Sequence, residues 1–239
     1  MNLASVINDP VRAVRVAAAA QLAHLKLDKL TDSQRKAFEK AMVELRESQE
    51  LSLDHAGGHL VLASFARQHQ RFEEAIQHLV DAIKLEPYMA GPRQELASLM
   101  QELKGDEAEI HRLRAEEADL LERDAKLAPN NADIFFRLGK LRYLLDEYDR
   151  AEAAFKTACE KAPRDYECLL MLALMQQKQY EKTSDNKHFN DAIATVKAMH
   201  DLNRDDPRAK AILRGLLVTW HQKNPNAKPD AKPDDGGKK

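Results

Sequence analysis

One spacing of small, bulky and proline residues recurs along the chain and constrains its fold more than any other feature. An alanine is followed by a bulky apolar residue after 4 positions, by a second alanine after 7 and by a proline after 12. These offsets place the first three residues on one face of an α-helix, and the proline ends the helix. The pattern therefore predicts a repeated helical unit. Its two full copies are Ala75, Leu79, Ala82 and Pro87, and Ala151, Phe155, Ala158 and Pro163.

The intervals between copies indicate a constant repeat period. Pro163 follows Pro129 by 34 positions, and Ala75 follows Ala41, the start of a weaker copy, by the same interval. Ala151 follows Ala75 by 76 positions, which is two such periods plus 8. We therefore expect one intervening unit that is longer than the others.

The copy that ends at Pro163 also carries a Phe-x-x-Leu-Gly segment at 135–139. Together these residues resemble the tetratricopeptide repeat (TPR), a helix–turn–helix unit of about 34 residues. The tyrosine of the family pattern is displaced by one position, since Arg142 stands in its place and Tyr143 follows it.

The resemblance implies an all-α fold, an α-solenoid in which TPR helical hairpins stack into a right-handed superhelix. A single hairpin cannot bury its apolar face, whereas stacked hairpins share one continuous core. We expect Gly139 and Ala151 where the two helices of a hairpin approach closely, and Phe155 in the space between hairpins.

Four TPR units are expected within residues 56–206, over 56–89, 90–131, 132–165 and 166–206. The second unit contains the additional positions between the two full copies, which predict a second helix over 106–128 that is lengthened by about two turns. The fourth unit also exceeds the period, and its extra length is expected mostly in a polar loop from Gln179 to Asn190.

Two shorter segments precede the four units. Residues 31–55 predict a degenerate TPR half-repeat, a second helix with its N-cap within 31–34. Residues 1–30 resemble the second helix of a short HEAT-like repeat, with Asp9 as N-cap and Pro10 in the first turn. The buried stripe expected for that helix is Val11, Val14, Ala18, Leu22 and Leu25.

The segments after the four units differ in composition. Residues 207–223 predict a capping helix that is apolar on one side and charged on the other, with Trp220 in the core. Residues 224–239 are rich in Pro, Asp, Lys and Gly and contain only two alanines as apolar residues, so we expect them to be disordered.

The combination of HEAT-like and TPR units resembles the rear part of some large bacterial multi-domain proteins, including multihaem cytochromes. We therefore expect residues 1–239 to be, or to descend from, the C-terminal part of a longer chain. No CxxCH motif occurs, so no residue supports a haem. The cytoplasm is the default compartment, and the periplasm would follow if the longer chain is exported.

Composition excludes several classes of partner. Lys and Arg number 37 against 39 Asp and Glu, so no basic field favours nucleic acid. No apolar run approaches the roughly 18 residues that span a bilayer, and membrane insertion is not expected. Cys159 and Cys168 fit no metal or redox motif, and we expect two reduced, packed thiols that lie near each other.

Residues for enzymatic chemistry are not recognisable. His55 and His59 are four apart, but Ala56 replaces the glutamate of an HExxH metal site. Gly57-Gly58 and Gly236-Gly237 follow no strand, so a phosphate loop is not indicated. We expect no enzymatic activity, no metal and no cofactor.

In a TPR solenoid the first helices of the hairpins line a concave groove that suits a peptide or a partner's helix. The Lys and Asn clamp of chaperone-binding members is absent here, since Leu60 and Ser64 occupy its first places. Arg137, Lys140 and Tyr143 are the strongest contact candidates, because Arg and Tyr are enriched at interfaces. The full candidate set is Arg67, Gln94, Ser98, Gln101, Phe136, Arg137, Lys140, Tyr143, Gln177 and Lys178.

The sequence thus favours a non-enzymatic scaffold that binds a protein or peptide partner in the groove. The alternative is an organising or targeting module at the C-terminal end of a larger redox or secretory protein. The 179–190 loop and the 106–128 helix are secondary contact candidates because they depart from the repeat period.

Overall fold

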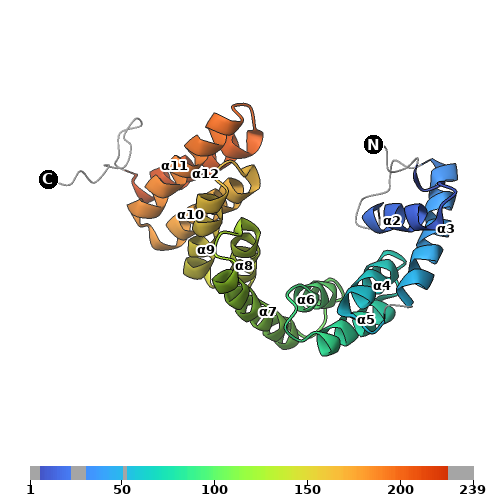
Figure 1. The fold of residues 1–239 in the computed structure, drawn as a ribbon. Coiled ribbons are helices and arrows are strands. Elements are labelled where there is room, and N and C mark those ends of the chain that lie inside the picture. Colours follow the sequence, from blue (N-terminus) through green and yellow to red (C-terminus); the bar gives the residue numbers. More distant parts are fainter. Residues whose placement is uncertain (1–5, 23–30, 51–52, 226–239) are drawn as a thin grey trace. The chain divides into compact units, whose positions relative to one another are not determined.

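The computed structural model describes residues 6–22, 31–50 and 53–225, and within these ranges it contains eleven α-helices and no strand (Figure 1). The chain therefore has the all-α fold expected from the repeat. Its contacts form two compact units, Met1–Glu117 and Ala118–Lys239, which are described separately below. The helices are α2 (Arg12–Leu22), α3 (Asp32–Glu50), α4 (Ala56–Gln68), α5 (Phe72–Leu85), α6 (Pro92–Glu102), α7 (Glu107–Leu127), α8 (Ala132–Leu144), α9 (Tyr148–Lys161), α10 (Tyr166–Thr183), α11 (Asn186–Leu202) and α12 (Pro207–Lys223).

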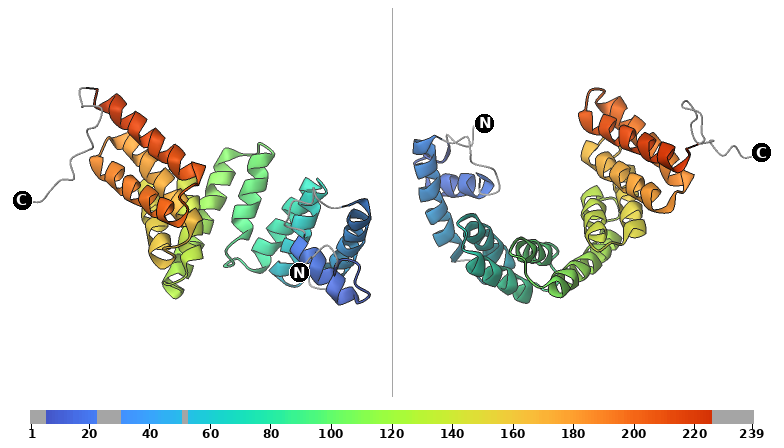
Figure 2. Two further views of the ribbon diagram at one scale, coloured as in Figure 1. Left: turned by 90° about the horizontal axis from the view of Figure 1, so that it is seen from above. Right: turned by 180° about the vertical axis from the view of Figure 1, so that it is seen from behind.

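The helices form hairpins of successive elements, α4 with α5 in the first unit, and α8 with α9 and α10 with α11 in the second (Figure 1). In the second unit α12 packs against both α10 and α11 (Figure 2). The unit boundary falls within α7. That helix has 21 residues where α5 and α9 have 14 each, which confirms the lengthened helix expected over 106–128. No helix in the described ranges combines the length and apolar character needed to cross a membrane.

The turns after α4, α6 and α8 share one backbone geometry. Gln70, Lys104 and Asp146 each adopt a left-handed conformation, with φ of 59°, 56° and 59°. The amide of the following residue donates to a carbonyl five positions earlier, which is the Schellman ending of a helix. Because Gln70 and Lys104 are one repeat period apart, the backbone repeats with the sequence. The donor and acceptor pairs are Arg71 and Ala66, Gly105 and Met100, and Glu147 and Arg142, with N–O distances of 2.8, 2.8 and 2.9 Å.

Close packing within the α8–α9 hairpin depends on Gly139. A methyl group at this position would lie 2.7 Å from two ring carbons of Phe155, far inside van der Waals contact. Phe155 and Ala151 are both fully buried, and the rings of Phe136 and Phe155 pack in a T-shaped arrangement at a centroid distance of 5.8 Å. The close approach expected at Gly139 is therefore confirmed, and Ala151 and Phe155 are buried as expected.

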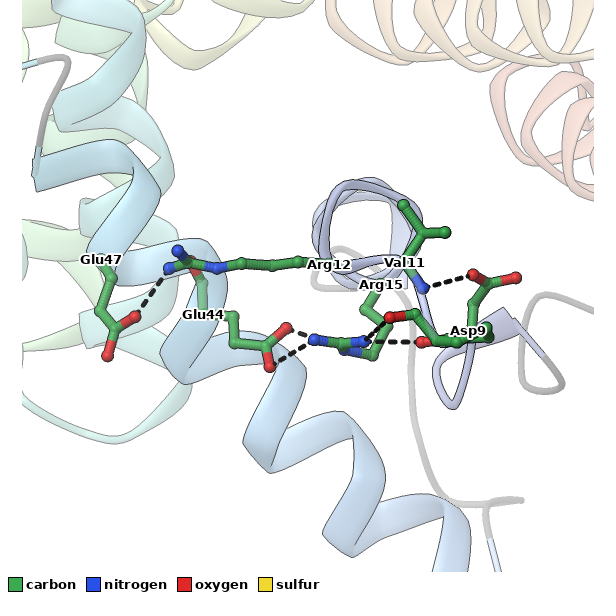
Figure 3. Close-up of polar contacts among 7 residues, drawn as sticks. Asp9, Val11, Arg12, Arg15, Glu44 and Glu47 are labelled. Carbon is green, nitrogen blue, oxygen red and sulfur yellow. Dashed lines mark hydrogen bonds and ion pairs between the residues drawn. The ribbon is translucent and has the colours of Figure 1, made fainter.

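In the first unit, helix α2 is held on α3 by paired charges (Figure 3). The Arg15 guanidinium donates to both carboxylate oxygens of Glu44, at 2.9 and 2.8 Å, and also to the Asp9 and Pro10 carbonyls. Arg12 forms a second, exposed ion pair with α3. The Asp9 side chain accepts a hydrogen bond from the Val11 amide at 2.8 Å, one residue before α2 begins. Asp9 therefore makes the capping contact expected of it, but α2 begins only at Arg12, so Pro10 precedes the helix and does not lie in its first turn as predicted.

The prediction of a buried apolar stripe on α2 is wrong for its first residue. Val11 is 55 % exposed, whereas Ala18, Ala19 and Leu22 are buried. The reason is that the first turn of α2 faces α3 through charged side chains, so only the last turns of α2 contribute to the apolar core. Leu25 lies outside the described residues.

Helix α3 begins with a capping box, as the sequence indicates for residues 31–34. The Thr31 hydroxyl accepts from the Gln34 amide at 3.3 Å, and the Gln34 side chain accepts from the Thr31 amide at 3.0 Å. Two otherwise unpaired donors are thereby satisfied.

The prediction of a polar loop over residues 179–190 is wrong. Only residues 184 and 185 separate α10 from α11, and the extra length extends both helices. Tyr180 and Phe189 meet edge to face across the two extensions at 5.2 Å and are 1 % and 3 % exposed. Burial of these two rings stabilises the extra turns and outweighs the polar composition of the segment.

Helix α12 buries one side as expected, but its other side carries apolar side chains as well as charged ones. Leu213, Leu217 and Val218 are 36 %, 40 % and 50 % exposed on its outer side. The expectation of a polar outer face for this cap is therefore wrong. The disordered tail expected over 224–239 lies outside the described residues from 226 onward. The buried residues of α12 include Ile212, Leu216 and Trp220.

Candidate functional site

In the second unit, a pocket of about 370 Å³ opens between α8 and α10, the first helices of two successive hairpins. Phe155 from α9 and Met175 from α10 form an apolar floor and are almost completely buried. Tyr143 and Leu174 stand at the opening with 37 % and 43 % of their surface exposed. The pocket therefore offers an apolar base with accessible apolar walls. Its lining residues are Tyr143, Phe155, Met171, Leu174, Met175, Gln177, Lys178 and Glu181.

The rim of this pocket carries a lysine held against two aromatic rings. The Lys178 ammonium lies 4.9 Å from the ring centre of Tyr143 and 4.5 Å from that of Tyr148. Lys182 lies 5.2 Å above the same Tyr148 ring. Hydrogen bonding to the Tyr148 and Tyr143 hydroxyls raises the pKa of Lys178, so the ammonium is positively charged at neutral pH. On the same rim, the Gln177 amide donates to Glu181 at 2.9 Å.

Three of the predicted contact residues, Tyr143, Gln177 and Lys178, come together around this pocket. Lys140 lies on α8 outside the lining, with its ammonium 5.7 Å from the ring centre of Phe136. Phe136 itself is half-buried against Phe155.

Arg137 also lies on α8 outside the pocket lining. Its guanidinium is 4.0 Å from the Asp133 carboxylate, and its side chain is 40 % exposed. Arg137, Lys140 and Tyr143 follow one another at intervals of three along the helix, so they share its exposed side.

The predicted contact residues of the first unit bind one another or their neighbours instead. Gln94 donates to Ser98 at 3.0 Å, and Arg67 forms an ion pair with Glu102 at 2.6 Å. Gln101 accepts from Arg114 of α7 at 2.6 Å. The hollow beside Arg67 has a volume of only about 30 Å³, close to that of one water molecule. The volume of this hollow is therefore far smaller than that of the pocket between α8 and α10.

Sequence reasoning missed Tyr148, Glu181 and Lys182, which complete the rim. Tyr148 begins the second helix of its hairpin, whereas the groove of a TPR solenoid is lined by first helices. Glu181 and Lys182 lie in the segment that was expected to be a loop. Recognition that α10 continues to Thr183 would have placed both residues on the α10 helix beside Lys178.

Arg142, which replaces the family tyrosine, holds α7, α8 and α9 together. Its side chain is only 5 % exposed and forms ion pairs with Glu122 at 2.5 Å, Glu147 at 2.7 Å and Asp119 at 3.8 Å. A buried guanidinium requires such partners because burial of an unpaired charge is costly. Arg142 therefore positions the helix that carries Tyr143.

The histidine pair His55 and His59 does not converge on a common point. His59 lies 3.1 Å from the His78 ring nitrogen and 3.1 Å from the Leu53 carbonyl, whereas His55 is the exposed N-cap residue of α4. The described part of the chain has no group of three or more metal-binding side chains.

Repeated hairpins with a shared turn geometry define a protein of the TPR fold. Solved structures agree with this assignment. The chain is similar to YrrB, a TPR protein with an unusual peptide-binding site, at a TM-score of 0.52 and 15 % identity over 90 % of this chain and 98 % of YrrB. It is also similar to TTC0263, a thermophilic TPR protein of Thermus thermophilus, at a TM-score of 0.54 and 16 % identity over 87 % of this chain and 100 % of that protein. No protein-family model and no curated protein sequence matches the chain.

Proposed function

We propose that this protein is a non-enzymatic scaffold that binds a peptide segment of a partner protein in the pocket between α8 and α10. The observation that carries the proposal is the pocket itself, an apolar cavity bordered by a lysine and two tyrosines beside the first helices of adjacent hairpins. Its volume of about 370 Å³ lies within the roughly 300 to 1,000 Å³ of ligand sites. YrrB, a protein of the same fold, has a peptide-binding site, which supports this choice of ligand class.

The chemistry of the pocket indicates what the peptide carries. An apolar side chain of the peptide would cover Leu174 and fill the space above Met175 and Phe155. An adjacent carboxylate of the peptide would meet Lys178, whose ammonium is already oriented by Tyr143 and therefore loses little freedom on binding.

The proposal is tested by selecting short random peptides on the intact protein and measuring their affinity for two matched variants. Leu174→Glu places a charge in the pocket wall, and Leu85→Glu places the same charge on α5, outside the pocket, at a residue of similar exposure. Selected peptides are expected to lose at least tenfold in affinity for Leu174→Glu, because a carboxylate must be desolvated against the apolar floor.

The Leu85→Glu variant is expected to bind the selected peptides like the parent protein. Circular dichroism checks that both variants remain helical. Peptides that bind Leu174→Glu as tightly as the parent would refute the assignment of the pocket. Failure to enrich any peptide would refute the proposed function itself.

A further inference from the structure

A second hollow lies on α11 and α12, and it is lined by residues that differ from those of the pocket described above. It has a volume of about 490 Å³ and is lined on α11 by Phe189, Ile193 and Val196 and on α12 by Leu213 and Leu217. An adjoining hollow of about 330 Å³ shares Leu213 and Leu217 and continues along α12. Together these two hollows, termed the α11–α12 groove below, form an elongated apolar surface.

The position of this groove within the repeat is shown by the matching starts of α10 and α12. Asp165 accepts hydrogen bonds from the first amides of α10, and Asp206 accepts one in the same way at the start of α12. Counted from these two caps, Leu213 of α12 corresponds to Leu172 of α10, and Leu217 corresponds to Gln176.

The corresponding residues of α10 are covered by the second helix of its hairpin. Leu172 and Gln176 are 6 % and 4 % exposed, and the Gln176 side chain accepts a hydrogen bond from Thr195 of α11 at 2.8 Å. Leu213 and Leu217 remain 36 % and 40 % exposed. Among the described residues, no helix follows α12 to cover them. The α11–α12 groove is therefore the place where the second helix of a hairpin would pack.

Charge identifies the kind of helix that fits. Among the described residues that line the two hollows, none is acidic, and the basic ones come from both helices. Lys210 lies 3.6 Å from Asp205, a carboxylate that is 98 % exposed, whereas Lys197 and Arg214 form no ion pair with a described residue. The basic and titratable residues around the groove are Lys197, His200, Lys210, Arg214 and His221.

Two occupants from the protein's own chain fit this surface poorly. Residues 224–239 are rich in Lys, Asp and Pro and contain no Leu, Ile, Val, Met or aromatic side chain, so they offer no apolar helix face to fill the hollow. Symmetric pairing of two α12 helices would bring one basic rim against the other, and like charges in contact oppose association.

We infer that the α11–α12 groove binds an amphipathic helix of a partner protein, one with an apolar stripe flanked by Asp or Glu. This helix would pack where a hairpin's second helix packs and would place its acidic residues beside Lys197 and Arg214. The inference is independent of the proposed function, because none of the residues involved lines the α8–α10 pocket.

The test uses three designed peptides of one length that contain the same leucine stripe at helical spacing. The first has Glu beside the stripe, the second has Lys there, and the third has the Glu composition in scrambled order. Fluorescence anisotropy with the intact protein is expected to show at least tenfold tighter binding of the first peptide than of either control peptide. Equal binding of all three, or binding of none, would overturn the inference.

Variants then locate the binding site of the first peptide. Leu217→Glu is expected to reduce its affinity at least tenfold. Leu85→Glu, a change of similar exposure on α5 outside both sites, is expected to leave the affinity unchanged. The double variant Lys197→Glu with Arg214→Glu is expected to reverse the preference toward the Lys-flanked peptide. If Leu217→Glu leaves the affinity unchanged, the peptide binds elsewhere. If the parent protein forms a dimer and Leu217→Glu abolishes it, the occupant of the groove is a second copy of this chain. Either result overturns the inference.

Discussion

Substitution of Gly139 by alanine tests the contact that joins the α8–α9 hairpin. The added methyl would lie 2.7 Å from the Phe155 ring, and that ring is completely buried. Overpacking of a buried site costs about 1 to 3 kcal/mol. Phe155 borders the α8–α10 pocket and can shift toward it, so the lower half of this range applies. Alanine also favours the helix by about 1 kcal/mol over glycine.

A steric cost of about 1 to 2 kcal/mol against a gain in helix propensity of about 1 kcal/mol predicts that Gly139→Ala lowers the free energy of unfolding by up to about 1 kcal/mol. In the background of Phe155→Leu the ring is absent. The same substitution is then expected to stabilise the protein by about 0.5 to 1 kcal/mol, which is the propensity term alone. The two substitutions are therefore coupled by the steric cost of about 1 to 2 kcal/mol, within the range of contacting residues.

The measurement is urea unfolding of the parent, the two single variants and the double variant. Fluorescence of the only tryptophan, Trp220, reports on the second unit because this side chain is 5 % exposed there. Stabilisation by Gly139→Ala in the presence of Phe155 would show that the helices do not meet at this point, and the packing argument would be refuted.

Three further predictions concern charge, pH and reactivity. The double substitution Arg137→Glu with Lys140→Glu is expected to weaken binding of peptides selected on the α8–α10 pocket by about tenfold with unchanged helicity, as measured by anisotropy and circular dichroism. Burial, together with the adjacent histidine, lowers the pKa of His78, so folding favours the neutral ring. The free energy of unfolding therefore has its full value above about pH 6.5 and falls as the pH decreases below it. Urea unfolding across this range is expected to show a weaker decline for His78→Gln, and an identical decline would contradict the assignment. The thiols of Cys159 and Cys168 are both free and buried, and burial raises the pKa of each, so a thiol reagent is expected to label them only as fast as the second unit unfolds.

The repeat was predictable because its contacts are encoded at fixed intervals. Alanines at positions such as 75, 82 and 151 are fully buried, since larger side chains would separate the helices. The turn residues were less obvious. Gln70 and Asp146 adopt left-handed conformations without glycine, so composition does not mark these turns, and only the spacing of the flanking helices does.

The features that sequence reasoning missed depend on contacts between distant residues. Whether residues 179–190 form a loop is decided by the meeting of Tyr180 with Phe189, and the polar residues around these rings conceal that contact. Arg142 is read from the sequence as a departure from the family pattern, but its burial among carboxylates from neighbouring helices gives it a structural role.

The site was predictable only in part. First-helix positions led to Tyr143, Gln177 and Lys178, whereas Tyr148 lies on a second helix and escaped that rule. The interpretation of residues 1–239 as the C-terminal part of a larger redox or secretory protein stays a prediction.

The most direct test of the proposed scaffold is the response of its methionine methyl groups to a selected peptide. Met171 and Met175 line the α8–α10 pocket, whereas Met199 lies on α11 and Met42 on α3. In protein labelled at methionine methyls, titration with the peptide is expected to shift the NMR signals of Met171 and Met175 and to leave those of Met199 and Met42 in place. Shifts confined to Met199 or Met42, with Met171 and Met175 unchanged, would contradict binding between α8 and α10.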